Sequence, residues 1–197
     1  MLINRVKGTI MEKRNLGNTG TKVGALGIGA MSFSDFYGPT NTQESHAILK
    51  MALDNGIDHI DTAKVYGMGL SEERIGQFLN TLSPKDRQFF KIATKGGIDR
   101  KNFDDKGTVV FDNSKEFLTE ELNNSLRRLG VDCVELYYVH RREADRAIEE
   151  VTETLVEFIN DGKIKQFGFS EIAPTSLERA ASIHPVGAVQ SEYSLST

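Results

Sequence analysis

The stretch GIDHIDTAKVYG, residues 56–67, sets the pattern on which the rest of the chain is built. It contains a short, mostly apolar segment at residues 57–61, which is typical of a buried strand and which ends on Asp61. Tyr66 follows in a loop that ends on Gly67. Because aspartate also begins turns and caps helices, the meaning of Asp61 depends on the sequence around it.

Helix-like and strand-like segments alternate on both sides of this stretch. Apolar residues at helical spacing predict helices at residues 42–55, 71–82, 114–129, 147–160 and 174–183. Apolar runs between them predict strands at residues 25–30, 57–61, 89–94, 131–139, 164–169 and 188–192. Asn18, Thr19 and Gly20 predict a hairpin turn near the start, and Pro84 is interpreted as a break between helix and strand. The polar segment at residues 98–113 is expected to be a long loop that partly covers a site.

This alternation indicates a parallel sheet covered by helices, in which right-handed crossovers place successive strands side by side. Two architectures fit: an open doubly wound sheet, and a closed (β/α)8 barrel, which usually needs about 250 residues. The chain has 197 residues, so length alone favours the open sheet.

Composition limits the function. A chain of 197 residues with 39% hydrophobic and 26% charged residues fits one globular domain, expected at residues 11–197 after an extension at residues 1–10. The net charge of -4 provides no basic surface for nucleic acid. No apolar run approaches the roughly 20 residues of a membrane helix, and the first residues do not resemble a secretory signal. With Cys133 as its one cysteine, the protein is expected to be cytoplasmic, and no metal site is expected.

Three successive predicted strands end on chemically active side chains: Asp61, Lys95 and His140. Parallel neighbours lie about 4.8 Å apart, so these side chains should meet at the carboxyl edge of the sheet, where α/β sites are built. Tyr66 belongs to the loop above the same edge. Each residue alone has an ordinary structural explanation, but together they suit carbonyl reduction.

In such a reaction, hydride delivery to the carbonyl carbon leaves a developing alkoxide that must receive a proton. Tyr66 could donate this proton if the ammonium group of Lys95 stabilised the tyrosinate, with Asp61 holding Lys95 charged and oriented. His140 could donate a hydrogen bond to the substrate oxygen and polarise it.

Several motifs resemble the aldo-keto reductase family in order and spacing, over essentially everything from Met11 onward. They are DTAKVYG at 61–67, IATKGG at 92–97, LYYVHR at 136–141, GKIKQFGFSE at 162–171 and AVQSEYSL at 188–195. Within the family, they are most similar to the bacterial, fungal and plant branch that reduces assorted aldehydes.

The resemblance implies a parallel (β/α)8 TIM-type barrel with an N-terminal β-hairpin, of which this chain holds about six β-α units. It also implies NADPH-dependent reduction of aldehydes or ketones by a tetrad of Asp61, Tyr66, Lys95 and His140, with Tyr66 as general acid.

Other residues are assigned from the same resemblance. Ser170 and Gln190 match positions that hold the nicotinamide carboxamide, Met31 is placed beside the cofactor, and Glu171 stands where many members have asparagine. His59 is expected to point into the barrel as a hydrogen-bonded core residue.

Strands seven and eight of such a barrel are not found, so the chain is expected to be C-terminally truncated and to bind NADPH weakly or not at all. Its open barrel edges are expected to allow self-association. The alternatives to an active reductase are a non-catalytic regulatory relative, like the potassium-channel β subunits, and an inactive fragment. The expected partner is a small carbonyl substrate, with no nucleic acid and no membrane.

Overall fold

The computed structural model describes residues 11–17, 20–103 and 109–195. The expected extension at residues 1–10, and Asn18 and Thr19 of the expected hairpin turn, lie outside these ranges. Within them, no helix combines the length and apolar character that a membrane span requires.

A parallel sheet of six strands forms the centre of the fold, in the spatial order β10-β9-β8-β5-β4-β3. The strands are β3 (Gly27–Gly29), β4 (His59–Asp61), β5 (Lys91–Gly96), β8 (Leu136–Val139), β9 (Phe167–Ser170) and β10 (Ala188–Gln190). Their order in space follows their order along the chain, so each crossover advances in the same direction. A doubly wound sheet reverses direction part-way. The curled sheet is therefore of the barrel type, and the expectation drawn from length alone was wrong.

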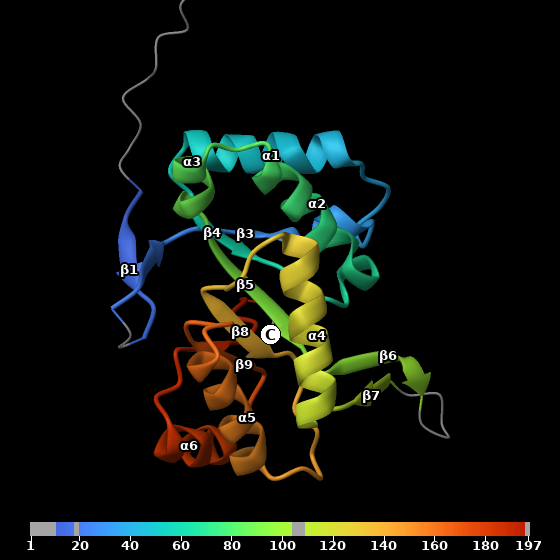
Figure 1. Cartoon of the computed structure of the whole chain (residues 1–197), viewed down its shortest axis with the longest axis vertical. Helices are drawn as coiled ribbons and strands as arrows, with labels where there is room; N and C mark the ends of the chain where they lie inside the picture. Colours follow the sequence, from blue (N-terminus) through green and yellow to red (C-terminus); the bar gives the residue numbers. More distant parts are fainter. Residues whose placement is uncertain (1–10, 18–19, 104–108, 196–197) are drawn as a thin grey trace, which may run out of the picture.

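Helices cover one face of this sheet (Figure 1). They are α1 (Thr42–Asp54), α2 (Leu70–Asn80), α4 (Lys115–Leu129), α5 (Ile148–Asn160) and α6 (Pro174–Ile183). The 3-10 turn η1 (Ala30–Ser34) precedes α1, and the 3-10 turn η2 (Tyr66–Gly69) precedes α2. Local sequence sets their ends. Asn41 and Glu44 form a capping box at the start of α1, and Gly130 ends α4 in the left-handed conformation with φ 66°.

The two faces of the sheet bury different side chains. The outer face contributes to the main core beneath the helices, through residues such as Ile60, Ile92, Tyr137, Phe167 and Phe169. The inner face carries a smaller cluster of Ala93, Leu136 and Tyr138, with Leu16 and Ala188 packed against it. Successive strand residues alternate between the faces, so Asp61 and Lys95 share the inner face with Ala93.

An antiparallel hairpin of β1 (Lys13–Asn15) and β2 (Lys22–Gly24) lies at the amino ends of the parallel strands. Lys13 Nζ lies 2.5 Å from Asp58 Oδ2, and the Gly24 N–H donates to Asp58 Oδ1 at 2.7 Å. His59 comes next, half-buried, with Nδ1 3.2 Å from the Lys91 carbonyl oxygen. The hairpin is therefore attached at the end of the sheet opposite to the strand ends that carry Lys95 and His140.

The prediction of a long loop at residues 98–113 was wrong for most of this segment. The segment contains an antiparallel hairpin of β6 (Ile98–Phe103) and β7 (Val109–Phe111), which projects from the molecule on the side opposite to β1 (Figure 1). Valine and phenylalanine favour strands even in a largely polar segment.

The interpretation of Pro84 as a simple break was also wrong, because it begins a short helix, α3 (Pro84–Phe89). Proline suits the first turn of a helix, where its missing N–H would have no partner within the helix. The Ser83 side chain caps this turn by accepting a hydrogen bond from the Asp86 N–H.

Candidate active site

The four residues expected to act together lie at the carboxyl edge of the sheet. Asp61 ends β4, Lys95 lies near the end of β5, His140 follows β8, and Tyr66 begins η2. In barrels of this type, the loops at this edge carry the functional groups.

Lys95 lies at the centre of the group, and its side chain is fully buried. Its Nζ lies 2.5 Å from Asp61 Oδ1, 2.9 Å from the Thr62 carbonyl oxygen and 3.2 Å from the Tyr66 hydroxyl. The three N–H donors of an ammonium group are matched here by three oxygen acceptors, so the group is fixed in position beside the phenol.

His140 is placed beside Tyr66, with ring centroids 5.8 Å apart in an edge-to-face arrangement. Its backbone N–H donates to the Gly96 carbonyl at 2.8 Å, which fixes it to the end of β5. Burial, followed by the charges of Lys95, Arg141 and Arg100, lowers the pKa of His140 to about 3. The imidazole is thus neutral at pH 7.

Only one nitrogen of this imidazole suits an incoming ligand. Nδ1 is buried and has no hydrogen-bond partner among the described residues. A hydrogen bond from the ring to a ligand would therefore come from Nε2.

The backbone after Tyr66 requires glycine. Gly67 has φ 63°, and a Cβ atom there would lie 2.8 Å from Ser34 Cβ. A larger residue would push η2 away from η1, so glycine keeps the tyrosine loop close to the sheet.

A cavity of about 820 Å³ opens in front of these residues. Tyr66 and His140 line it, together with all three residues expected to contact a cofactor: Met31, Ser170 and Gln190. The β6–β7 hairpin supplies another wall through Ile98, Arg100, Val109 and Phe111. The segment at residues 98–113 thus borders the site, although as a hairpin.

Two of the expected cofactor residues already have partners. Gln190 Nε2 donates to Asp61 Oδ2 at 3.0 Å, and Arg141 Nη1 donates to Ser170 Oγ at 2.9 Å. Glu171, in the left-handed conformation with φ 53°, lines the same cavity. These bonds leave Gln190 its amide oxygen as an acceptor and Ser170 its hydroxyl hydrogen as a donor, so the two side chains could still bind the carboxamide of a nicotinamide.

Sequence reasoning did not assign a role to Arg141. It donates from Nη1 to the carbonyl oxygen of His140 at 2.7 Å as well as to Ser170, so it joins two strand ends. Its position directly after His140 in the sequence could have predicted that it lies at the site.

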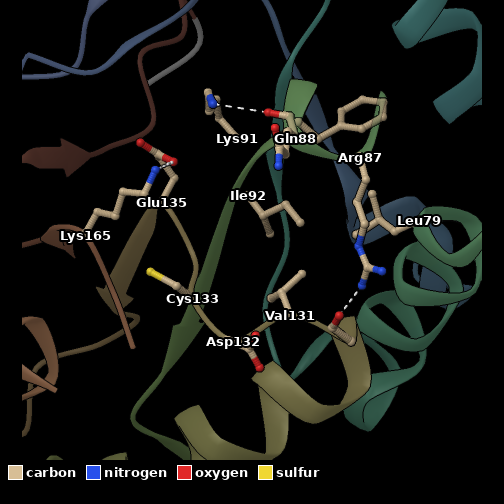
Figure 2. A pocket seen from close by; sticks show the side chains of 12 residues that line it. Leu79, Arg87, Gln88, Lys91, Ile92, Val131, Asp132, Cys133, Glu135 and Lys165 are labelled. Carbon is tan, nitrogen blue, oxygen red and sulfur yellow. Dashed lines mark hydrogen bonds and ion pairs between the residues drawn. The ribbon is translucent and has the colours of Figure 1, made fainter. Parts of the chain in front are cut away.

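A second cavity, of about 590 Å³, is lined by residues near the amino ends of the strands, such as Lys91, Ile92 and Glu135 (Figure 2). No residue of the tetrad lines it. Its charged side chains are largely matched within the protein: Lys165 pairs with Glu135 at 2.9 Å, and Arg87 donates to the Gly130 carbonyl oxygen. Cys133 is half-buried at this cavity, and burial raises the pKa of its thiol. These features indicate a structural surface rather than a reactive site.

Comparison with known proteins finds relatives of this chain. The chain is 36% identical over 181 residues to the NADP(+) aldo-keto reductase yakc of Schizosaccharomyces pombe, covering 92% of this chain and 52% of that protein. It is 37% identical over 183 residues to probable aldo-keto reductase 1 of Glycine max, covering 92% and 51%. The chain thus spans about half the length of the curated relatives it matches.

Solved structures are similar as well. The holo form of an aldo-keto reductase from Bacillus halodurans superposes with a TM-score of 0.80 at 31% identity, covering 93% of this chain and 58% of that one. A glycerol dehydrogenase from Gluconobacter oxydans superposes with a TM-score of 0.78 at 29% identity, covering 91% and 54%. The model of the aldo/keto reductase family matches residues 25–197. The chain belongs to the aldo/keto reductase family.

Proposed function

We propose that the protein reduces aldehydes or ketones to alcohols with NADPH, using Tyr66 as general acid. The observation that carries this proposal is the position of Lys95 Nζ, within hydrogen-bond distance of both Asp61 and the Tyr66 hydroxyl. A purely structural lysine would not need a phenol beside a cavity.

Each residue of the tetrad would have its own role in the reaction. The neutral imidazole of His140 donates a hydrogen bond to the carbonyl oxygen and makes the carbon more electrophilic. As negative charge develops on that oxygen, the Tyr66 hydroxyl transfers its proton to it. Lys95 stabilises the resulting tyrosinate, and Asp61 keeps Lys95 in place.

NADPH fits this arrangement at its nicotinamide end, and when bound it supplies the hydride. Met31, Ser170 and Gln190 would hold that end, since all three line the cavity beside Tyr66. The Bacillus halodurans relative was solved in a holo form, and the name of the Schizosaccharomyces pombe relative includes NADP(+).

Turnover tests the proposal and separates it from the regulatory alternative. Purified protein is incubated with NADPH and a panel of small aldehydes, and loss of NADPH absorbance is followed together with the alcohol formed. Because the chain is expected to bind NADPH weakly, NADPH is supplied in large excess, and equimolar NADPH consumption and alcohol formation are expected. If the protein binds NADPH in a fluorescence titration but reduces no member of the panel, the regulatory reading replaces the reductase. If it binds no NADPH, the reductase reading fails for this chain, and the inactive fragment takes its place.

We also propose self-association through the sheet edges. Among the described strands, β3 and β10 lie at the two ends of the sheet order, and each pairs with one neighbour only. Unpaired parallel edges are templates for further strands. Sedimentation velocity should show concentration-dependent dimers or larger species, and a monomer at all concentrations would contradict this.

We place the protein in a reducing compartment such as the cytoplasm, because Cys133 has no second cysteine to pair with.

A further inference from the structure

Helix α4 places one carboxylate behind the candidate site, on the outer side of the sheet. Glu121 is only 4% exposed, and its Oε2 accepts a hydrogen bond from the Gly97 N–H at 2.7 Å. Its Oε1 lies 2.7 Å from Lys64 Nζ, whose side chain is itself 13% exposed. Glu121 does not line the 820 Å³ cavity, so it can influence the chemistry only through its partners.

Those partners belong to the two segments that carry the site. Lys64 precedes Tyr66 by two residues, and Gly97 follows Lys95 by two residues. One carboxylate therefore joins the tyrosine loop to the end of β5.

The backbone passes this connection on to the remaining site residues. The Lys64 N–H donates to the Lys95 carbonyl oxygen at 3.3 Å, and the His140 N–H donates to the Gly96 carbonyl oxygen at 2.8 Å. Gly97 itself has φ 96°, a conformation that leaves its N–H directed at Glu121 and that other residues rarely adopt. Any displacement of Gly97 would therefore also displace Lys95 and His140.

Holding a carboxylate in this place costs stability. Burial raises the pKa of Glu121, while the hydrogen bonds and charge from Lys64 and Gly97 act in the opposite direction. A buried ion pair contributes little net stability compared with apolar residues of similar volume, but it fixes geometry. The ion pair of Glu121 and Lys64 is therefore better explained by a role in positioning the site than by a contribution to stability.

We propose that Glu121 is a positioning residue for the site: it clamps the Lys64 and Gly97 segments so that Tyr66, Lys95 and His140 keep their mutual distances. The proposal rests on the proposed function for its effect on turnover, and on geometry alone for its effect on the site.

The test compares Glu121→Gln with Glu120→Gln, the same chemical change at the adjacent, exposed position of α4. Glu121→Gln should lower kcat for aldehyde reduction at least about tenfold, because small misplacements of catalytic groups cost up to about 100-fold, while KM for the aldehyde stays within about twofold. Glu120→Gln should change neither. Lys64→Met should reproduce the effect, and the double variant Lys64→Met, Glu121→Gln should lose little more than either single variant, because both act through one contact.

A second measurement does not depend on turnover. In NMR spectra of protein with ¹³C-labelled tyrosine rings, the Tyr66 resonance, assigned with Tyr66→Phe, should move in Glu121→Gln and Lys64→Met but not in Glu120→Gln. If the wild type reduced no carbonyl compound, the proposed function would fail, and these resonances would still decide on Glu121. An unchanged Tyr66 resonance in a folded Glu121→Gln protein would overturn the proposal. If Glu121→Gln does not fold, Lys64→Met, which leaves the Gly97 hydrogen bond in place, decides in its stead.

Discussion

Replacing Lys95 with methionine should destabilise the protein by about 3 kcal/mol, because it leaves the Asp61 carboxylate without its cation. Methionine has nearly the length of lysine, so the cavity left behind is small. The change therefore removes the charge and the hydrogen bonds while keeping most of the packing.

The magnitude follows from the burial of the pair. Removing one partner of a buried ion pair costs about 3–5 kcal/mol. The Lys95 side chain is fully buried, but that of Asp61 is 18% exposed and keeps its hydrogen bond from Gln190 at 3.0 Å. The lower end of the range is therefore expected. Asp61→Asn should cost about the same, since it leaves the Lys95 ammonium buried without an anion.

The assay is urea unfolding at pH 7, followed by circular dichroism, for the wild type, both single variants and the double variant. Independent effects would sum to about 6 kcal/mol, whereas members of one pair should lose only about 3 kcal/mol together. If the double variant lost the full sum to within about 0.5 kcal/mol, Lys95 and Asp61 would not be coupled and the reasoning about the tetrad would be refuted.

Three further changes have definite expected outcomes. Because the pKa of His140 is lowered from 6.5 to about 3, the unfolded chain binds a proton in this interval that the folded protein does not, so stability falls as the pH drops through it. Between pH 7 and 5, urea unfolding should show the wild type losing about 2 kcal/mol more than His140→Gln, and equal losses would refute this. Gly96→Ala would place a Cβ atom 2.0 Å from the Tyr137 hydroxyl, so it should lower the unfolding free energy by about 3 kcal/mol, and an unchanged value would contradict the packing. Tyr137→Phe removes a buried hydroxyl that has no partner among the described residues, so in thermal unfolding it should leave stability unchanged or raise it by about 1 kcal/mol. A clear loss of stability would mean that the hydroxyl makes a hydrogen bond, which contradicts the prediction.

The sequence predicted where the four tetrad residues lie, because three of them stand at strand ends and the fourth follows one of these strands. A run of apolar residues that stops on Asp61, and another that stops at Lys95, place both side chains at one edge of a parallel sheet. Since spatial neighbours follow chain order in this fold, the approach of Tyr66 and His140 to Lys95 could be expected from the sequence.

Other features depend on contacts that local patterns do not report. The β6–β7 hairpin lies outside the main core, so it has no strong apolar periodicity, and the segment was expected to be a loop. The direction of winding is set by how successive helices pack, which chain length does not reveal. The contact of Glu121 with Lys64 joins a helix to a distant loop, and on sequence alone both residues look like ordinary surface charges.

The most direct test of the account is the rate of carbonyl reduction by Tyr66→Phe. The phenylalanine keeps the ring beside His140 and removes only the hydroxyl that lies 3.2 Å from Lys95 Nζ. Tyr37→Phe, the same change at an exposed tyrosine, serves as the control. General acid catalysis contributes about 100- to 10,000-fold, so Tyr66→Phe should lower kcat by at least about 100-fold with NADPH affinity unchanged, while Tyr37→Phe retains wild-type activity. A Tyr66→Phe protein that reduces aldehydes at the wild-type rate would contradict the central claim.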